Sequence, residues 1–91
     1  GKVERALVDI DEMIRVNPGA AKYHRLRSVA CLKLNRLVDA EQAATRTIEV
    51  APKFTPGHLL RGKLRSTLGD LDAAAIDFSE GVKMLEMAGR L

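Results

Sequence analysis

The strongest constraint on this chain is a repeat of thirty-four residues that runs through most of its length. The stretch YHRLRS at residues 23–28 recurs as GHLLRG at residues 57–62, which sets His24 thirty-four positions before His58. Alanine recurs at positions 6, 40 and 74, and Asn17-Pro18 recurs as Ala51-Pro52. A fixed period of this size is typical of chains that stack one supersecondary unit along their length. The 91 residues are therefore expected to form one domain of repeated units.

Each repeat contains two helical stretches separated by turn residues. Pro18 and Pro52 each follow an apolar helical stretch, and a proline cannot continue such a helix. Asn35 and Gly69 stand where the chain must reverse, and both residue types tolerate the left-handed conformation that often ends a helix. The sequence therefore predicts helices at about 3–16, 20–34, 37–50, 56–68 and 71–87.

Composition restricts the core and the cellular setting. Aromatic residues make up 3% of the chain, so the core must be built mainly from aliphatic residues and methionine. No apolar run approaches the ~20 residues that a membrane span needs, and no charged-then-apolar leader opens the sequence. The lone Cys31 excludes an internal disulfide and favours a reducing compartment. A cytoplasmic protein without a membrane segment is the expectation.

The run LGDLDAAAIDF at residues 68–78, preceded by LLRG and by helix-ending prolines in the earlier units, resembles the tetratricopeptide repeat. The resemblance implies an all-α fold of about five helices, arranged as a right-handed superhelical array of antiparallel helix pairs. It assigns a structural role to a small residue in the first helix, a turn glycine, a close-packing alanine, a packing aromatic and a terminal proline. The matching positions are Ala6, Pro18, Ser28, Ala40, Pro52, Gly62, Gly69, Ala74 and Phe78.

The same register divides the chain into about two and a half repeats. Residues 1–19 are a half repeat containing the second helix alone, 20–53 a full repeat, and 54–91 a full repeat with an extended last helix. We expect a piece of a longer array, whose ends expose apolar faces and self-associate through them. These faces are Ala6, Ile10 and Met13 at one end and Met84, Leu85, Met87 and Leu91 at the other.

Charge is divided between the two kinds of helix. All twelve acidic residues lie in 1–17, 39–52 and 70–91, whereas 18–38 and 53–69 hold nine of the fifteen Lys and Arg residues. In the family that the chain resembles, first helices line a concave groove, so the resemblance implies a basic inner face and an acidic outer one. The alternative is that the opposite charges simply pair between adjacent helices.

Helical spacing places basic and apolar residues on one stripe of each first helix. The predicted peptide-binding groove comprises Lys22, Arg25, Val29, Leu32 and Lys33, followed by Leu59, Lys63, Ser66 and Thr67. Cations beside short apolar patches suit a peptide or partner segment with acidic and aliphatic side chains. The sequence therefore predicts a non-catalytic protein-interaction scaffold.

One subset of the family grips a C-terminal carboxylate with Lys, Asn and Arg side chains at fixed groove positions. This sequence does not reproduce the set, because Val29, Leu59 and Leu60 occupy places of polar residues and one contributing helix is absent. We do not expect a carboxylate clamp.

Two other functions compete with the peptide-binding interpretation. A basic groove can follow a phosphate backbone, but single-strand binders usually add aromatic platforms, and Tyr23 alone lies near the basic stripe. Nucleic acid is therefore the less favoured partner. The third hypothesis is a structural spacer within a longer solenoid.

Catalysis, cofactors and metal binding are not expected. His24 and Cys31 share a helical face, but two ligands do not make a structural zinc site, and their spacing places roughly 10.5 Å of helix between them. The repeated histidine and arginine instead suggest a structural role, in which these side chains join neighbouring helices. We predict that Arg61 pairs with Asp77 and that Arg27 reaches back to Asp9.

Overall fold

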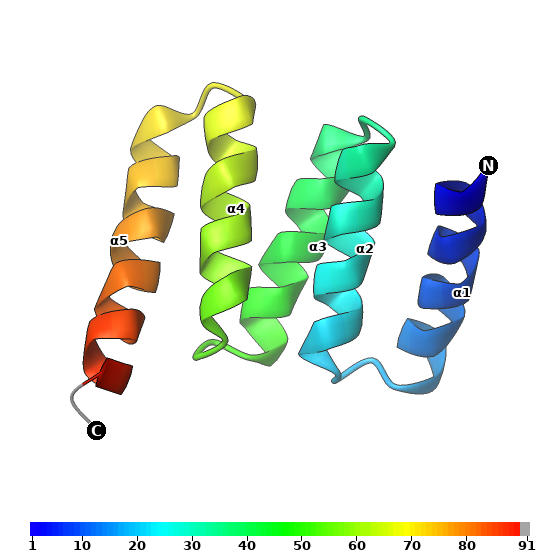
Figure 1. Ribbon diagram of the computed structural model, residues 1–91, viewed down its shortest axis with the longest axis horizontal. Coiled ribbons are helices and arrows are strands. Elements are labelled where there is room, and N and C mark those ends of the chain that lie inside the picture. Colours follow the sequence, from blue (N-terminus) through cyan, green and yellow to red (C-terminus); the bar gives the residue numbers. More distant parts are fainter. Residues whose placement is uncertain (90–91) are drawn as a thin grey trace.

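The computed structural model describes residues 1–89, and this part of the chain folds into five α-helices (Figure 1). Residues 90 and 91, which include the predicted exposed Leu91, lie outside the described residues. The helices are α1 (Lys2–Val16), α2 (Ala21–Lys33), α3 (Leu37–Val50), α4 (Thr55–Thr67) and α5 (Leu71–Gly89). None of them is long and apolar enough to cross a bilayer.

Each helix packs against the helix that follows it, so α1 contacts α2, α2 contacts α3, α3 contacts α4 and α4 contacts α5. Figure 1 shows the result as a row of antiparallel helices, with α3 partly behind α2. The molecule measures 40 × 30 × 18 Å, which is the elongated shape expected when units stack along one direction. The all-α helix-pair array predicted from the period is confirmed.

The two turns inside the helix pairs share one geometry. Asn35 has φ 58° and Gly69 has φ 90°, both in the left-handed region that the sequence predicted for these positions. The N–H of Arg36 donates to Cys31 O at 2.8 Å, and the N–H of Asp70 donates to Arg65 O at 2.9 Å. These bonds satisfy carbonyls that the helix end would otherwise leave unpaired.

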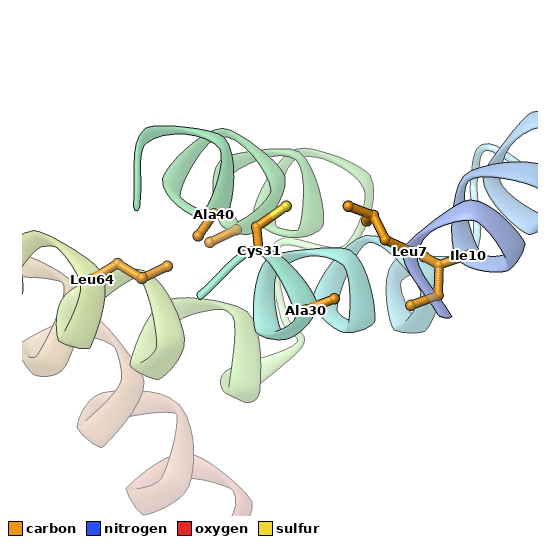
Figure 2. Close-up of a cluster of buried hydrophobic side chains, with 7 residues drawn as sticks. Leu7, Ile10, Ala30, Cys31, Ala40 and Leu64 are labelled. Atoms are coloured by element: carbon orange, nitrogen blue, oxygen red, sulfur yellow. The ribbon is translucent and has the colours of Figure 1, made fainter. Parts of the chain in front are cut away.

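The core between the units consists of small and aliphatic side chains (Figure 2). It contains Leu7, Ile10, Ala30, Cys31, Ala40, Ala44 and Leu64. Ala40 is fully buried, and the Ser28 hydroxyl donates to its carbonyl oxygen at 2.7 Å. Small residues at these positions therefore allow α2 and α3 to approach closely.

The first helix departs from two sequence-based expectations. Ile10, predicted on an unpartnered face, is buried together with Leu7, because these residues lie on the side of α1 that faces α2. Ala6, predicted to pack closely like Ala40 and Ala74, is exposed, because no described helix covers its side of α1. Met13 is also exposed, as predicted.

One glycine on each helix, Gly62 on α4 and Gly81 on α5, allows these two helices to pack closely. A Cβ added at Gly62 would lie 2.8 Å from Cε1 of Phe78, and one added at Gly81 would lie 2.6 Å from Cδ2 of Leu59. Both distances are shorter than carbon–carbon contact allows. The aromatic ring of α5 thus fills the space that the missing side chain of Gly62 leaves.

Candidate functional site

The repeated histidines have a structural role. His24 Nε2 lies 2.6 Å from Pro18 O, and His58 Nε2 lies 2.8 Å from Pro52 O. A carbonyl oxygen can only accept, so Nε2 carries the hydrogen and donates it in both units. Both imidazoles are buried and tie the start of a first helix to the loop before it. The motif that first marks the repeat is therefore a joint between units.

The arginine that accompanies each histidine pairs with an acid on a second helix. Arg61 donates to both carboxylate oxygens of Asp77, at 3.0 and 2.9 Å, which confirms the predicted pair. Arg27 Nε donates to Asp11 Oδ1 at 2.9 Å, so the predicted partner Asp9 is wrong. Asp9 and Asp11 are about 200° apart around the helix, and only Asp11 faces α2.

A second arginine joins this network, which sequence reasoning missed. Arg65 Nη1 donates to Asp77 Oδ2 at 3.2 Å, and Arg65 Nε donates to Glu41 Oε2 at 3.4 Å. Asp77 is 2% exposed, so two guanidinium groups compensate its buried charge. Glu41, Arg65 and Asp77 lie on α3, α4 and α5, and the network therefore connects three helices.

These pairs divide the nine basic residues of 18–38 and 53–69 into two groups. Four of them form ion pairs with acids: Arg27, Arg36, Arg61 and Arg65. The other five, Lys22, Arg25, Lys33, Lys53 and Lys63, form none within residues 1–89. The pairs of Arg27, Arg61 and Arg65 join different helices, whereas Arg36 pairs with Asp39 at the start of α3. Pairing between helices therefore accounts for part of the charge pattern and leaves a distinct set of free cations.

Four of the free cations are the basic members of the predicted groove, and we call Lys22, Arg25, Lys33 and Lys63 the basic face. All four are exposed, which leaves their charges available to a ligand. Lys22 Nζ lies 5.2 Å from the ring centroid of Tyr23, a distance at which the ring face attracts a cation.

Apolar and polar side chains accompany the basic face. Val29, Leu32 and Leu59 are half-buried, so each presents part of its apolar surface. Ser66 and Thr67 are exposed at the end of α4, where the Thr67 hydroxyl donates to Lys63 O at 3.0 Å. The groove residues thus combine free cations with apolar surface on α2 and α4, and their part in binding remains a prediction.

The two residues considered as metal ligands, His24 and Cys31, have separate surroundings on α2. Cys31 is fully buried among core side chains, which removes its thiol from solvent. The His24 ring is engaged with Pro18 O, as described above. Within residues 1–89 no cluster of three or more His, Cys, Asp or Glu side chains is arranged to hold a metal ion.

A row of antiparallel helix pairs with a thirty-four-residue period defines an α-helical repeat protein. Solved structures identify the repeat. The second tetratricopeptide-repeat domain of Spaghetti (RPAP3), bound to the HSP90 peptide SRMEEVD, matches 92% of this chain and 78% of its own with a TM-score of 0.87 and 28% identity. MamA matches 99% of this chain and 53% of its own with a TM-score of 0.95 at 18% identity, which supports the fold.

Sequence comparison agrees with this result, although no protein-family model matches the chain. Serine/threonine-protein phosphatase 5 of Mus musculus is 35% identical over 81 residues, which are 89% of this chain. The chain spans 16% of that protein's length, so the match concerns a small part of the phosphatase. The homologues of this chain are tetratricopeptide-repeat proteins, and its structural neighbours are tetratricopeptide-repeat domains.

Proposed function

We propose that this chain is a non-catalytic scaffold that binds an acidic and aliphatic segment of a partner protein across α2 and α4. The observation that carries the proposal is the basic face, whose four cations are exposed and free of ion pairs while four neighbouring arginines are paired. Selective pairing leaves positive charge where apolar side chains are also accessible. Such a surface favours carboxylates next to aliphatic side chains.

A relative supports this class of ligand. The related repeat domain of RPAP3 holds the peptide SRMEEVD, which carries three carboxylate side chains together with methionine and valine. We propose the same kind of ligand here, with the carboxylates near Lys22, Arg25 and Lys63 and the aliphatic side chains against Leu32 and Leu59. The relatives offer no support for the nucleic-acid alternative.

The proposed binding does not depend on a C-terminal carboxylate. A clamp needs polar side chains at the places that Val29, Leu59 and Leu60 occupy, and Leu59 and Leu60 are partly buried aliphatic groups that cannot donate hydrogen bonds. We therefore expect side-chain carboxylates to supply the charge that the cations recognise.

Fluorescence anisotropy with labelled SRMEEVD tests the proposal. Charge reversal by Lys22→Glu, Arg25→Glu or Lys63→Glu should weaken binding about tenfold, because an attractive contact becomes a repulsive one. Lys83→Glu is the matched control, since this exposed lysine on α5 changes net charge equally and lies outside the basic face. Equal weakening by Lys83→Glu, or no binding at millimolar peptide, would contradict the proposal.

Two further ligands separate the competing functions. A C-terminally amidated SRMEEVD should bind within about threefold of the free acid, since the clamp is missing. Poly-uridine RNA should bind weakly, because single-strand binders stack bases on aromatic side chains and aromatic residues make up 3% of this chain. Tight RNA binding with a steep salt dependence would instead favour the nucleic-acid alternative. If neither ligand class binds, the spacer hypothesis gains support.

A further inference from the structure

The two helices that carry the basic face are aligned level with each other. α2 and α4 each have thirteen residues, and their first residues, Ala21 and Thr55, are thirty-four positions apart. Consecutive helices of the row are antiparallel, so α2 and α4 run in the same direction (Figure 1). Residues thirty-four positions apart therefore occupy the same level along the two helices and the same side of the array.

The first two levels carry a cation on α2 and an uncharged apolar residue on α4. Lys22 is level with Pro56, and Arg25 is level with Leu59. Both cations are exposed and form no ion pair within residues 1–89, whereas Pro56 and Leu59 are half-buried. At these levels α2 supplies the positive charge, and α4 supplies the apolar surface.

The third level reverses this order. Val29 lies on α2, and Lys63 lies on α4. Lys63 is exposed and forms no ion pair in the described part of the chain, and Val29 is half-buried. Neither helix contains an acidic residue that would offset this change. The cation thus moves from one helix to the other between the second level and the third.

An extended peptide can match a pattern of this kind. Its side chains point alternately to opposite sides, and those on one side recur every ~6.8 Å. On α2 the three levels span about 10.5 Å from Lys22 to Val29, against about 13.6 Å for four residues of a strand. The long side chains of Lys22 and Lys63 can cover the difference of about 3 Å.

A peptide in which acidic and aliphatic residues alternate strictly does not match all three levels. Strict alternation places every acid on one side of the peptide, so the acid that follows those at Lys22 and Arg25 faces Val29. The aliphatic residue on the opposite side then faces Lys63. The carboxylate has an apolar neighbour instead of a cation, and Lys63 keeps no opposite charge beside it.

We propose that the ligand of the basic face is an extended segment along α2 and α4, in which the alternation of acidic and aliphatic residues shifts by one residue after the second pair. Glu-Leu-Glu-Leu-Leu-Glu has this order, with its glutamates facing the three cations and its leucines facing the three apolar residues. The inference rests on the proposed function and adds the order of side chains that the ligand must present. Val29 and Lys63 determine this specificity.

Three blocked peptides of one composition test the order: ELELLE, its reverse ELLELE and the strictly alternating ELELEL. Six residues are too few for a stable helix in water, so all three report on extended binding. The reverse sequence is included because the pattern fits either chain direction. NMR titration of the 91-residue protein should give ELELLE or ELLELE an affinity about fivefold above that of ELELEL, because one more carboxylate faces a cation.

A paired substitution moves the cation without changing net charge. Val29→Lys together with Lys63→Val places every cation of the three levels on α2, so ELELEL should become the preferred peptide by about fivefold. Val29 is half-buried, so Lys63→Val alone, at an exposed position, provides a variant with little risk to folding. This single substitution should make the affinities equal within about twofold, since each order then has one mismatch.

SRMEEVD separates this inference from the proposed function. If SRMEEVD binds and Lys63→Glu weakens its binding, while the three peptides bind equally or not at all, the order of side chains is wrong and the scaffold proposal stands. A preference for ELELLE or ELLELE that persists in Lys63→Val also overturns the order. If SRMEEVD and the three peptides all fail to bind at millimolar concentration, the proposed function itself is wrong.

Discussion

At the scale of single residues, Arg61 and Arg65 converge on the carboxylate of Asp77, which is 2% exposed. A carboxylate at this depth is tolerated because both guanidinium groups donate to it. Thr45 adds a longer contact, 3.4 Å from Arg61 Nη1. The packing of α4 against α5 therefore depends on a polar network as well as on apolar contact.

Replacing the shared acid should be costly. Asp77→Ala leaves two partly buried guanidinium groups without their main acceptor, and we expect the free energy of unfolding to fall by about 3 kcal/mol. Urea denaturation measures this change. Glu80→Ala on the same helix, an exposed residue without an ion pair in the described part of the chain, should cost less than about 0.5 kcal/mol. Equal effects of the two substitutions would show that the network around Asp77 does not stabilise the folded state.

Two glycines allow a matched comparison of packing. Gly62→Ala places a methyl group against three atoms of the Phe78 ring, whereas Gly81→Ala mainly meets the terminal methyl of Leu59, which can rotate away. Both substitutions raise helix propensity equally, so a difference in stability between the two variants reports how the new methyl group packs against its neighbour. We expect Gly62→Ala to be less stable than Gly81→Ala by about 1 kcal/mol in thermal or urea unfolding. Phe78→Leu should reduce this difference, and a persistent difference would mean that the ring is not its cause.

At the scale of helices and turns, most boundaries could be predicted because local signals specify them. Pro18, Pro52, Asn35 and Gly69 end or follow helices for reasons that a single sequence reveals, and the observed ends differ from the predicted ones by two residues at most. The last helix continues to Gly89 because no proline interrupts it, in agreement with the extension expected at Glu86.

Contacts between helices were less predictable than their ends. The Arg61–Asp77 pair follows from the register, but the bonds from Arg65 to Glu41 and from Arg27 to Asp11 depend on how adjacent helices are rotated against each other. The burial of Ile10 depends on the same rotation. Helical spacing predicts the residues of the basic face, and their role in binding stays a prediction, whereas the ion pairs show which cations of the described residues are free.

The left-handed turns provide a test at this scale. Gly69→Ala forces a side chain into φ 90° and should cost about 1–2 kcal/mol, even though nothing lies within 4 Å of the new methyl group. Gly19→Ala, which has open space and no positive φ, should change stability by less than about 0.5 kcal/mol. Urea midpoints measure both. A neutral Gly69→Ala would show that the turn relaxes out of the left-handed region.

At the scale of the whole molecule, stability should vary along the array. α4 packs against both α3 and α5, whereas α1 packs mainly against α2 and leaves Ala6 and Met13 exposed. Units in such arrays open locally from their less supported ends. Native-state hydrogen exchange should therefore show protection in the middle of α4 at least about tenfold above that in α1. Equal protection would indicate that all five helices unfold as one unit.

The network around Asp77 also limits how the repeats can be recombined. Thirty-four residues earlier, the position of Asp77 is held by Ala43 and that of Arg65 by Cys31, while Arg27 keeps the place of Arg61. A chimera with a second copy of residues 20–53 in place of 54–87 would keep the arginine and lose the acid that follows it. The two repeats share the thirty-four-residue period and the left-handed turn, yet they are not exchangeable modules. An engineered array built from this chain would need the Arg–Asp pair transplanted together with the helices that carry it.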